Sequence, residues 1–166
     1  MADAKIAPNT LEKVIAGEAP LNTFFGLTKD QIGAIAAMGF NLYEQGKTKD
    51  AETVFTGLIA LDGGYPLGYA GLGAVALSKE PPELDKAYEN LKKAVELDPK
   101  DPSIMANLGE TLLRQAKFDE AAKTFEKALA LDPQKKDPGA NRARAIIGGM
   151  EVVLSEAKKL QAAGKI

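Results

Sequence analysis

The side chains that could carry acid–base or metal chemistry in this chain are few in kind. Its 166 residues include no histidine and no cysteine, so the usual metal ligands, the commonest general base and the thiol nucleophile are all absent. Carboxylates remain, but the acidic runs PPELD and KFDEAAK are typical of solvated helix starts, where the helix dipole favours negative charge. We therefore expect no catalytic residue, no metal and no cofactor.

Phosphate and nucleic-acid binding are disfavoured as well. The glycine-rich stretches LDGGYPLG and GYAGLGA lack the Lys-Ser/Thr pair of a phosphate-binding loop. The formal net charge is -2, and lysines and arginines never run longer than a pair, so we expect neither a nucleic acid nor a membrane as partner. No apolar run has the length of a secretion signal or a membrane span, which favours a cytoplasmic protein.

A pattern of small and bulky residues recurs along the chain. Three alanines, 36 and 34 residues apart, are each followed four residues later by a bulky side chain: Ala51 with Phe55, Ala87 with Leu91 and Ala121 with Phe125. A glycine stands twelve or fourteen residues before each alanine, at Gly39, Gly73 and Gly109. This spacing is the tetratricopeptide repeat pattern, in which each unit of about 34 residues is a pair of antiparallel helices.

The pattern has a physical reason. A glycine without Cβ lets the second helix of a pair approach the first, and the bulky residue one turn after the alanine fills the space beside them. The sequence therefore predicts an all-α fold, a solenoid of three helix-turn-helix repeats. We expect an N-terminal helical segment and linker at residues 1–31, repeats over 32–133 (about 32–65, 66–101 and 102–135), and a C-terminal capping helix at 138–163.

Helix ends are marked by specific residues. Gly46 is expected to end a helix with positive φ, and Ala116 takes the same role in the third repeat. The Gly148-Gly149 pair is a candidate kink in the C-terminal helix. Helix starts are expected at Asn9 with Glu12, Thr28 with Gln31, Asp101 before Pro102, and Asp137 before Pro138.

The first half of the chain adds a more specific likeness. After a short helical segment come GLT, then GFNLYEQGK, DAETVF, a Leu-Asp connection and GLGA. This block, from about Ala16 to Leu77 and more loosely to about Pro133, resembles the class II chaperones of bacterial type III secretion, the SycD/LcrH-like family. The resemblance implies a cupped helical protein that binds extended segments of hydrophobic translocator proteins in its concave groove. It also implies a homodimer, formed through the N-terminal region, and no catalysis.

The candidate groove residues follow from helical spacing on the first helix of each repeat. They are Ala36, Phe40, Tyr43, Glu44, Leu67, Ala70, Ala74, Leu77, Asn107, Glu110, Leu113 and Arg114. The likeness implies that Phe40 and Tyr43, in GFNLY, are the groove aromatics, and buried aromatics commonly dominate such contacts. The candidate dimer residues are Leu11, Val14, Ile15, Leu21, Phe24 and Phe25.

Each of these assignments has a plainer alternative. Phe40 and Tyr43 could belong to the packing between repeats, and Glu110 with Arg114 could be an ordinary surface ion pair at i,i+4. Phe24 and Phe25 could pack on the first repeat instead of on a second subunit. A carboxylate clamp for acidic C-termini is disfavoured because its Lys and Asn positions hold alanine and phenylalanine.

Two functional hypotheses follow, in order of support. The first is a chaperone for hydrophobic secreted clients, and the second is a general repeat adaptor in a bacterial assembly. An enzymatic role is a distant third, given the missing histidine and cysteine.

Overall fold

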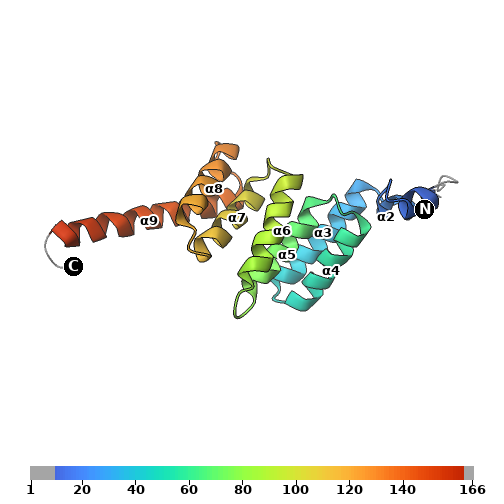
Figure 1. Cartoon of the computed structure of the whole chain (residues 1–166), viewed down its shortest axis with the longest axis horizontal. Coiled ribbons are helices and arrows are strands. Elements are labelled where there is room, and N and C mark those ends of the chain that lie inside the picture. Colours follow the sequence, from blue (N-terminus) through green and yellow to red (C-terminus); the bar gives the residue numbers. More distant parts are fainter. Residues whose placement is uncertain (1–9, 163–166) are drawn as a thin grey trace. The chain divides into compact units, whose positions relative to one another are not determined.

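The computed structural model describes residues 10–162, which are helical throughout their regular structure and contain no strand (Figure 1). The helices are α1 (Thr10–Ile15), α2 (Leu21–Phe24), α3 (Lys29–Glu44), α4 (Thr48–Leu61), α5 (Pro66–Ser78), α6 (Leu84–Leu97), α7 (Pro102–Arg114), α8 (Phe118–Leu131) and α9 (Pro138–Ala162). The chain divides after Leu97 into two compact units, called here the first and second units. The expected all-α repeat fold is confirmed.

The first unit holds two helix hairpins, α3–α4 and α5–α6, which are joined by packing of α5 on both α3 and α4. Its centre is Phe55 on α4, which is fully buried with Ala51 and with Val75 of α5. The small residue and the bulky residue one turn later therefore meet inside one core, as the repeat pattern predicts.

The glycines of the pattern lie where the helices come closest. An added Cβ would lie 2.7 Å from the Phe55 ring at Gly39, 2.5 Å from Leu91 at Gly73 and 2.7 Å from the Phe125 ring at Gly109. Such distances are shorter than any ordinary contact, so these three positions exclude a side chain. The predicted role of the three glycines is confirmed.

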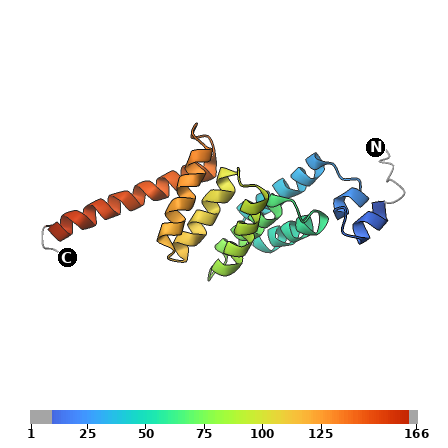
Figure 2. The same ribbon diagram turned by 45° about the horizontal axis from the view of Figure 1, so that its top comes forward.

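The second unit consists of the α7–α8 hairpin with α9 packed against both of its helices. Helix α9 starts as α7 does, with an aspartate followed by proline, and it meets α7–α8 as α5 meets α3–α4. Only its first half is covered: Figure 2 shows the rest extending beyond the hairpin, without interruption at Gly148-Gly149. The helix therefore does not break at Gly148-Gly149, and a kink there stays a prediction.

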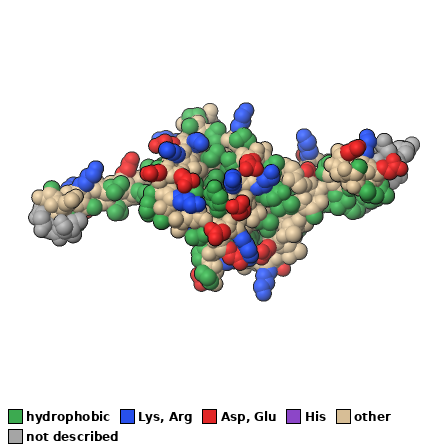
Figure 3. Space-filling model, viewed as in Figure 1, with side chains coloured by type: hydrophobic (Ala, Val, Ile, Leu, Met, Phe, Trp, Pro, Cys, Tyr) green, Lys and Arg blue, Asp and Glu red, His purple; other side chains and the backbone are tan. Residues whose placement is uncertain are grey.

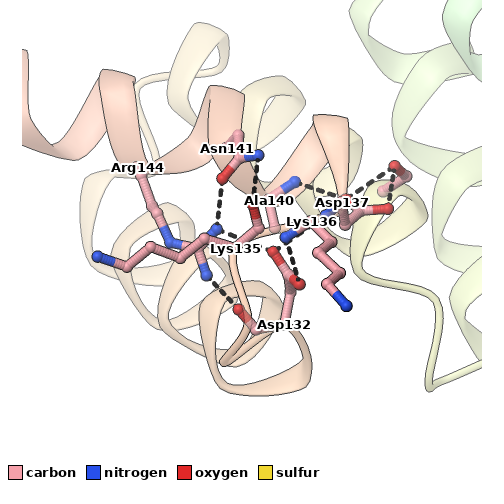
Figure 4. Close-up of polar contacts among 8 residues, drawn as sticks. Asp132, Lys135, Lys136, Asp137, Ala140, Asn141 and Arg144 are labelled. Atoms are coloured by element: carbon pink, nitrogen blue, oxygen red, sulfur yellow. Dashed lines mark hydrogen bonds and ion pairs between the residues drawn. The ribbon is translucent and has the colours of Figure 1, made fainter.

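A polar network fixes the turn between α8 and α9 (Figure 4). Asp132, which is buried, accepts hydrogen bonds from the backbone N–H groups of Lys136 and Asp137 at 3.0 and 3.2 Å, and an ion pair from Nη1 of Arg144 at 2.9 Å. Arg144 also donates to the Asp132 carbonyl. Burial by itself would raise the pKa of Asp132, but the hydrogen bonds from Arg144 and the two backbone amides outweigh it and hold the pKa below its ordinary value.

The predicted helix ends are also found. Thr28 and Gln31 form both hydrogen bonds of a capping box, and Asp101 accepts from the Ile104 amide at 2.9 Å. Gly46 and Ala116 have φ of +74° and +60° at the hairpin turns. Asn9, expected to start the first helix, lies outside the described residues.

The N-terminal helices belong to the first unit. Helix α2 contacts both α1 and α4, and the buried Asn22 donates a hydrogen bond of 3.1 Å to Asp62, just after α4. Across residues 10–162, no helix is both long enough and apolar enough to cross a membrane.

Candidate functional site

The two aromatic residues of the candidate site lie side by side on one face of α3. Phe40 and Tyr43 are both half-buried and pack against the core around Phe55. The Phe40 ring meets the Phe55 ring edge to face, with centroids 4.9 Å apart. Each aromatic side chain is therefore partly packed in the core and partly accessible. The alternative that these residues serve the packing of the repeats thus accounts only for their buried part.

The Tyr43 hydroxyl is chemically available. Within residues 10–162 no group hydrogen-bonds to it, although its ring is anchored in the core. A phenol held in this way can donate to, or accept from, the backbone of a bound chain without first losing an internal partner. Glu44, the next candidate residue, is exposed at the end of α3.

The aliphatic candidates on α3 and α5 divide into buried and half-buried residues. Ala36 of α3 and Ala70 of α5 are only 1% and 3% exposed, so they determine how closely the helices approach and offer almost no surface to a ligand. Leu67 is half-buried against the cluster of Ile32, Ala36 and Leu58. Ala74 and Leu77 are half-buried, and they remain open enough for contact.

In the second unit the candidate residues form a polar cluster. Glu110 on α7 lies between two arginines, 2.6 Å from Nη2 of Arg114 and 3.3 Å from Nε of Arg142 on α9. Arg142 also donates to the side-chain oxygen of Asn107. The plainer expectation of an i,i+4 pair is thus confirmed for Glu110 and Arg114, and Leu113 is half-buried one turn from Glu110.

Sequence reasoning missed Arg142. Residues 138–163 are expected to form a capping helix, and the candidate groove residues come only from the first helix of each repeat. The repeat offset gives no signal either, since the residue equivalent to Arg142 on α7 is the buried Ala106. The candidate residues of the second unit are thus mostly charged or polar, and those of the first unit are mostly aromatic or aliphatic.

The candidate dimer residues are largely on the surface of the first unit. Ile15 is 77% exposed, Phe25 57% and Leu11 49%, whereas Phe24 is half-buried with its ring edge-on to Phe25 at 5.4 Å. Val14 and Leu21 are half-buried. The space-filling view shows hydrophobic side chains exposed on both the N-terminal helices and α9 (Figure 3).

Comparisons with known proteins begin with the repeat itself. The tetratricopeptide repeat family matches residues 83–147. A stretch of 100 residues is 31% identical to the mouse protein O-mannosyl-transferase TMTC1, covering 58% of this chain but only 10% of that protein. Another of 111 residues is 26% identical to the low calcium response locus protein H of Yersinia pestis, covering 67% of this chain and 65% of that protein.

Solved structures extend the likeness over most of the chain. PcrH of Pseudomonas aeruginosa, crystallised with the chaperone binding region of PopB, is 30% identical with a TM-score of 0.61, covering 72% of this chain and 97% of that one. SycD of Yersinia enterocolitica, a type III secretion translocator chaperone, has a TM-score of 0.65 at 23% identity, covering 79% and 98%. The latter supports the fold alone.

The fold and the candidate surface define a helical repeat scaffold of the protein-binding kind, with the packing pattern of tetratricopeptide repeats. More particularly, the chain belongs to the SycD/LcrH-like family of class II type III secretion chaperones.

Proposed function

We propose that this protein is a cytoplasmic chaperone that holds an extended segment of a hydrophobic, translocator-type secreted protein. The observation that carries the proposal is the pair Phe40 and Tyr43, each anchored in the core and accessible on one face of α3. PcrH, which was crystallised with a client segment, supplies the analogy.

The chemistry of the surface suits such a client. An extended peptide needs apolar contacts for its side chains and polar groups for its backbone. Phe40, Ala74 and Leu77 offer the former in the first unit, and the Tyr43 hydroxyl the latter. On the second unit, Asn107, Glu110 and Arg114 offer polar groups of their own, and holding a client needs no catalytic group.

The test is co-expression with a hydrophobic translocator-type protein, for which PopB, whose chaperone binding region was crystallised with PcrH, is a suitable choice. Replacing Phe40 and Tyr43 together by alanine should reduce the soluble client recovered with the chaperone by about tenfold or more, because anchoring aromatics each contribute on the order of 2 kcal/mol. Met38→Ala is the matched control: Met38 is 49% exposed and lies on the opposite face of the same helix.

The outcomes separate binding from folding. Circular dichroism should show retained helices in the double variant, and Tyr43→Phe should reduce recovery less than the double change while leaving the core contact intact. Unchanged client recovery with the double variant, or equal loss with Met38→Ala, would contradict the proposal.

A second candidate is a general repeat adaptor, favoured by the match of residues 83–147 to the repeat family at large. It predicts a partner that is folded and soluble alone, whereas the chaperone function predicts a client that aggregates without the chain. Expressing the partner by itself distinguishes the two.

A further inference from the structure

Arg142 is a charged side chain of α9 that reaches the candidate face of α7. Its guanidinium group contacts Glu110 at 3.3 Å through Nε and donates to the side-chain oxygen of Asn107 through Nη2. Asn107 and Glu110 are one turn apart, so they share the face of α7 on which the candidate groove residues lie. Arg142 therefore adds a side chain of the last helix to the candidate surface of the second unit.

The two contacts with α7 use one edge of the Arg142 guanidinium group. Nε and Nη2 lie along the same edge of this rigid, planar group, and Nη1 lies away from that edge. Within residues 10–162, Nη1 of Arg142 has no hydrogen-bond partner, and the side chain is 51% exposed. Asn107 and Glu110 thus hold the group in a fixed orientation and leave the N–H donors of Nη1 available to a ligand.

The positive charge of Arg142 is only partly balanced. Its acidic partner within the described part of the chain is Glu110, and Glu110 also pairs with Arg114, at the shorter distance of 2.6 Å from Nη2 of that arginine. One carboxylate between two guanidinium groups does not neutralise both. A second carboxylate is the ligand that completes this arrangement, because its two oxygens match two N–H donors of a guanidinium group.

Aliphatic side chains lie on the same helix faces as these charges. Ile146 follows Arg142 by one turn on α9, and Leu113 follows Glu110 by one turn on α7. Both are half-buried, so each keeps some surface for contact. Apolar contacts that exclude water also strengthen a neighbouring ion pair. The second unit therefore suits an acidic residue that stands within an otherwise apolar segment.

We propose that Arg142 contributes to client specificity by binding the carboxylate of an aspartate or glutamate within the client segment. Asn107 and Glu110 are positioning residues in this arrangement, because they orient the guanidinium group. The inference rests on the proposed function, since it names one residue type in the segment that this function holds. It assigns a binding role to the capping helix, which would otherwise only cover the end of the repeats.

Selection from a peptide library tests the proposal without a known client sequence. Random peptides displayed on phage are selected on the immobilised full-length chain and on its variants, and the bound peptides are sequenced. On the natural chain, Asp or Glu should be enriched about fivefold or more at one position beside apolar residues, because a charge-assisted pair exceeds a neutral contact. Arg142→Gln should abolish this acidic preference and keep the apolar one. Arg142→Lys, which keeps the charge but loses the planar donors, should retain only part of it.

Two further variants separate this inference from the proposed function. Lys158→Gln removes the same charge from an exposed position of the same helix and should leave the acidic preference unchanged. The double change of Phe40 and Tyr43 to alanine should lower the apolar enrichment. Apolar enrichment without an acidic position, an acidic position that survives Arg142→Gln, or equal loss with Lys158→Gln would overturn the role of Arg142 and leave the proposed function standing. No apolar enrichment on the natural chain, or the same enrichment on the double variant, would overturn both.

Discussion

At the scale of single residues, Phe55 shows how closely the helices of the first unit approach. Its ring fits between Gly39 on α3 and Gly71 on α5, and an added Cβ would come within 2.7 Å of the ring at the first and 2.3 Å at the second. One aromatic side chain therefore holds three helices together, and it does so only because two of them present bare backbone.

This packing predicts opposite effects for one substitution at two glycines. Gly39→Ala should lower the free energy of unfolding by about 1–3 kcal/mol, since the ring must move to admit a methyl group. Gly57→Ala on α4 should raise it by about 0.5–1 kcal/mol, because nothing lies within 4 Å of the position and alanine favours the helix. Urea unfolding followed by circular dichroism measures both. A loss at Gly57 as large as that at Gly39 would show that the ring contact is not the cause.

These residue roles differ in how far the sequence predicts them. The offsets from Gly39 to Ala51 and Phe55 follow the repeat period, so their packing could be predicted without a structure. The burial of Ala36 could not, because it depends on how close α3 and α5 come, which no single helix pattern contains. Gly71 was missed for the same reason: it contacts the helix of a neighbouring repeat.

At the scale of elements, α9 depends on its first turn for its attachment to the second unit. Asp137 precedes the helix and accepts a 2.7 Å hydrogen bond from the Ala140 amide, while Ser103 of α7 donates to both of its carboxylate oxygens at 3.0 Å. Gly139 lies so close to Ser103 that a Cβ would be 2.6 Å from its backbone. The sequence predicted the cap from Asp137-Pro138, but not the link to α7.

Removing this cap should loosen α9 in particular. Asp137→Ala deletes both the helix cap and the Ser103 contact, and we expect a loss of about 1–2 kcal/mol in unfolding free energy. Hydrogen exchange should rise most in the first turns of α9. Asp137→Asn, which keeps an oxygen for the Ala140 amide, should lose less than half as much, and equal losses in the two variants would contradict a capping role.

At the scale of the whole molecule, the ionisable groups predict that the stability of the fold depends little on pH over a wide interval around neutrality. No histidine is present to titrate near neutrality. Hydrogen bonds from Lys86 and Lys79 hold the pKa of Glu83 below its ordinary value, and hydrogen bonds to Glu52 and Glu83 raise that of Lys79. Asp132 in the second unit and Glu83 in the first are thus carboxylates that prefer their charged form when folded.

The sign of each shift sets the stability profile. A carboxylate with a lowered pKa stabilises the fold at pH values above its ordinary pKa near 4, and this stabilisation is lost as the pH falls through its pKa in the folded protein. A lysine with a raised pKa stabilises the fold at pH values below its ordinary pKa near 10.4, and this stabilisation is lost as the pH rises through its pKa in the folded protein. Urea midpoints should therefore stay flat from about pH 5 to 9 and fall on either side.

Asp132→Asn should lower the plateau and make the acid limb shallower, because the carboxylate that prefers its charged form is gone. Glu151→Gln is the control, since this exposed carboxylate accepts no hydrogen bond from residues 10–162, and it should leave the limb as it was. An acid limb equally steep in Asp132→Asn would mean that the network around Arg144 does not couple protonation to folding.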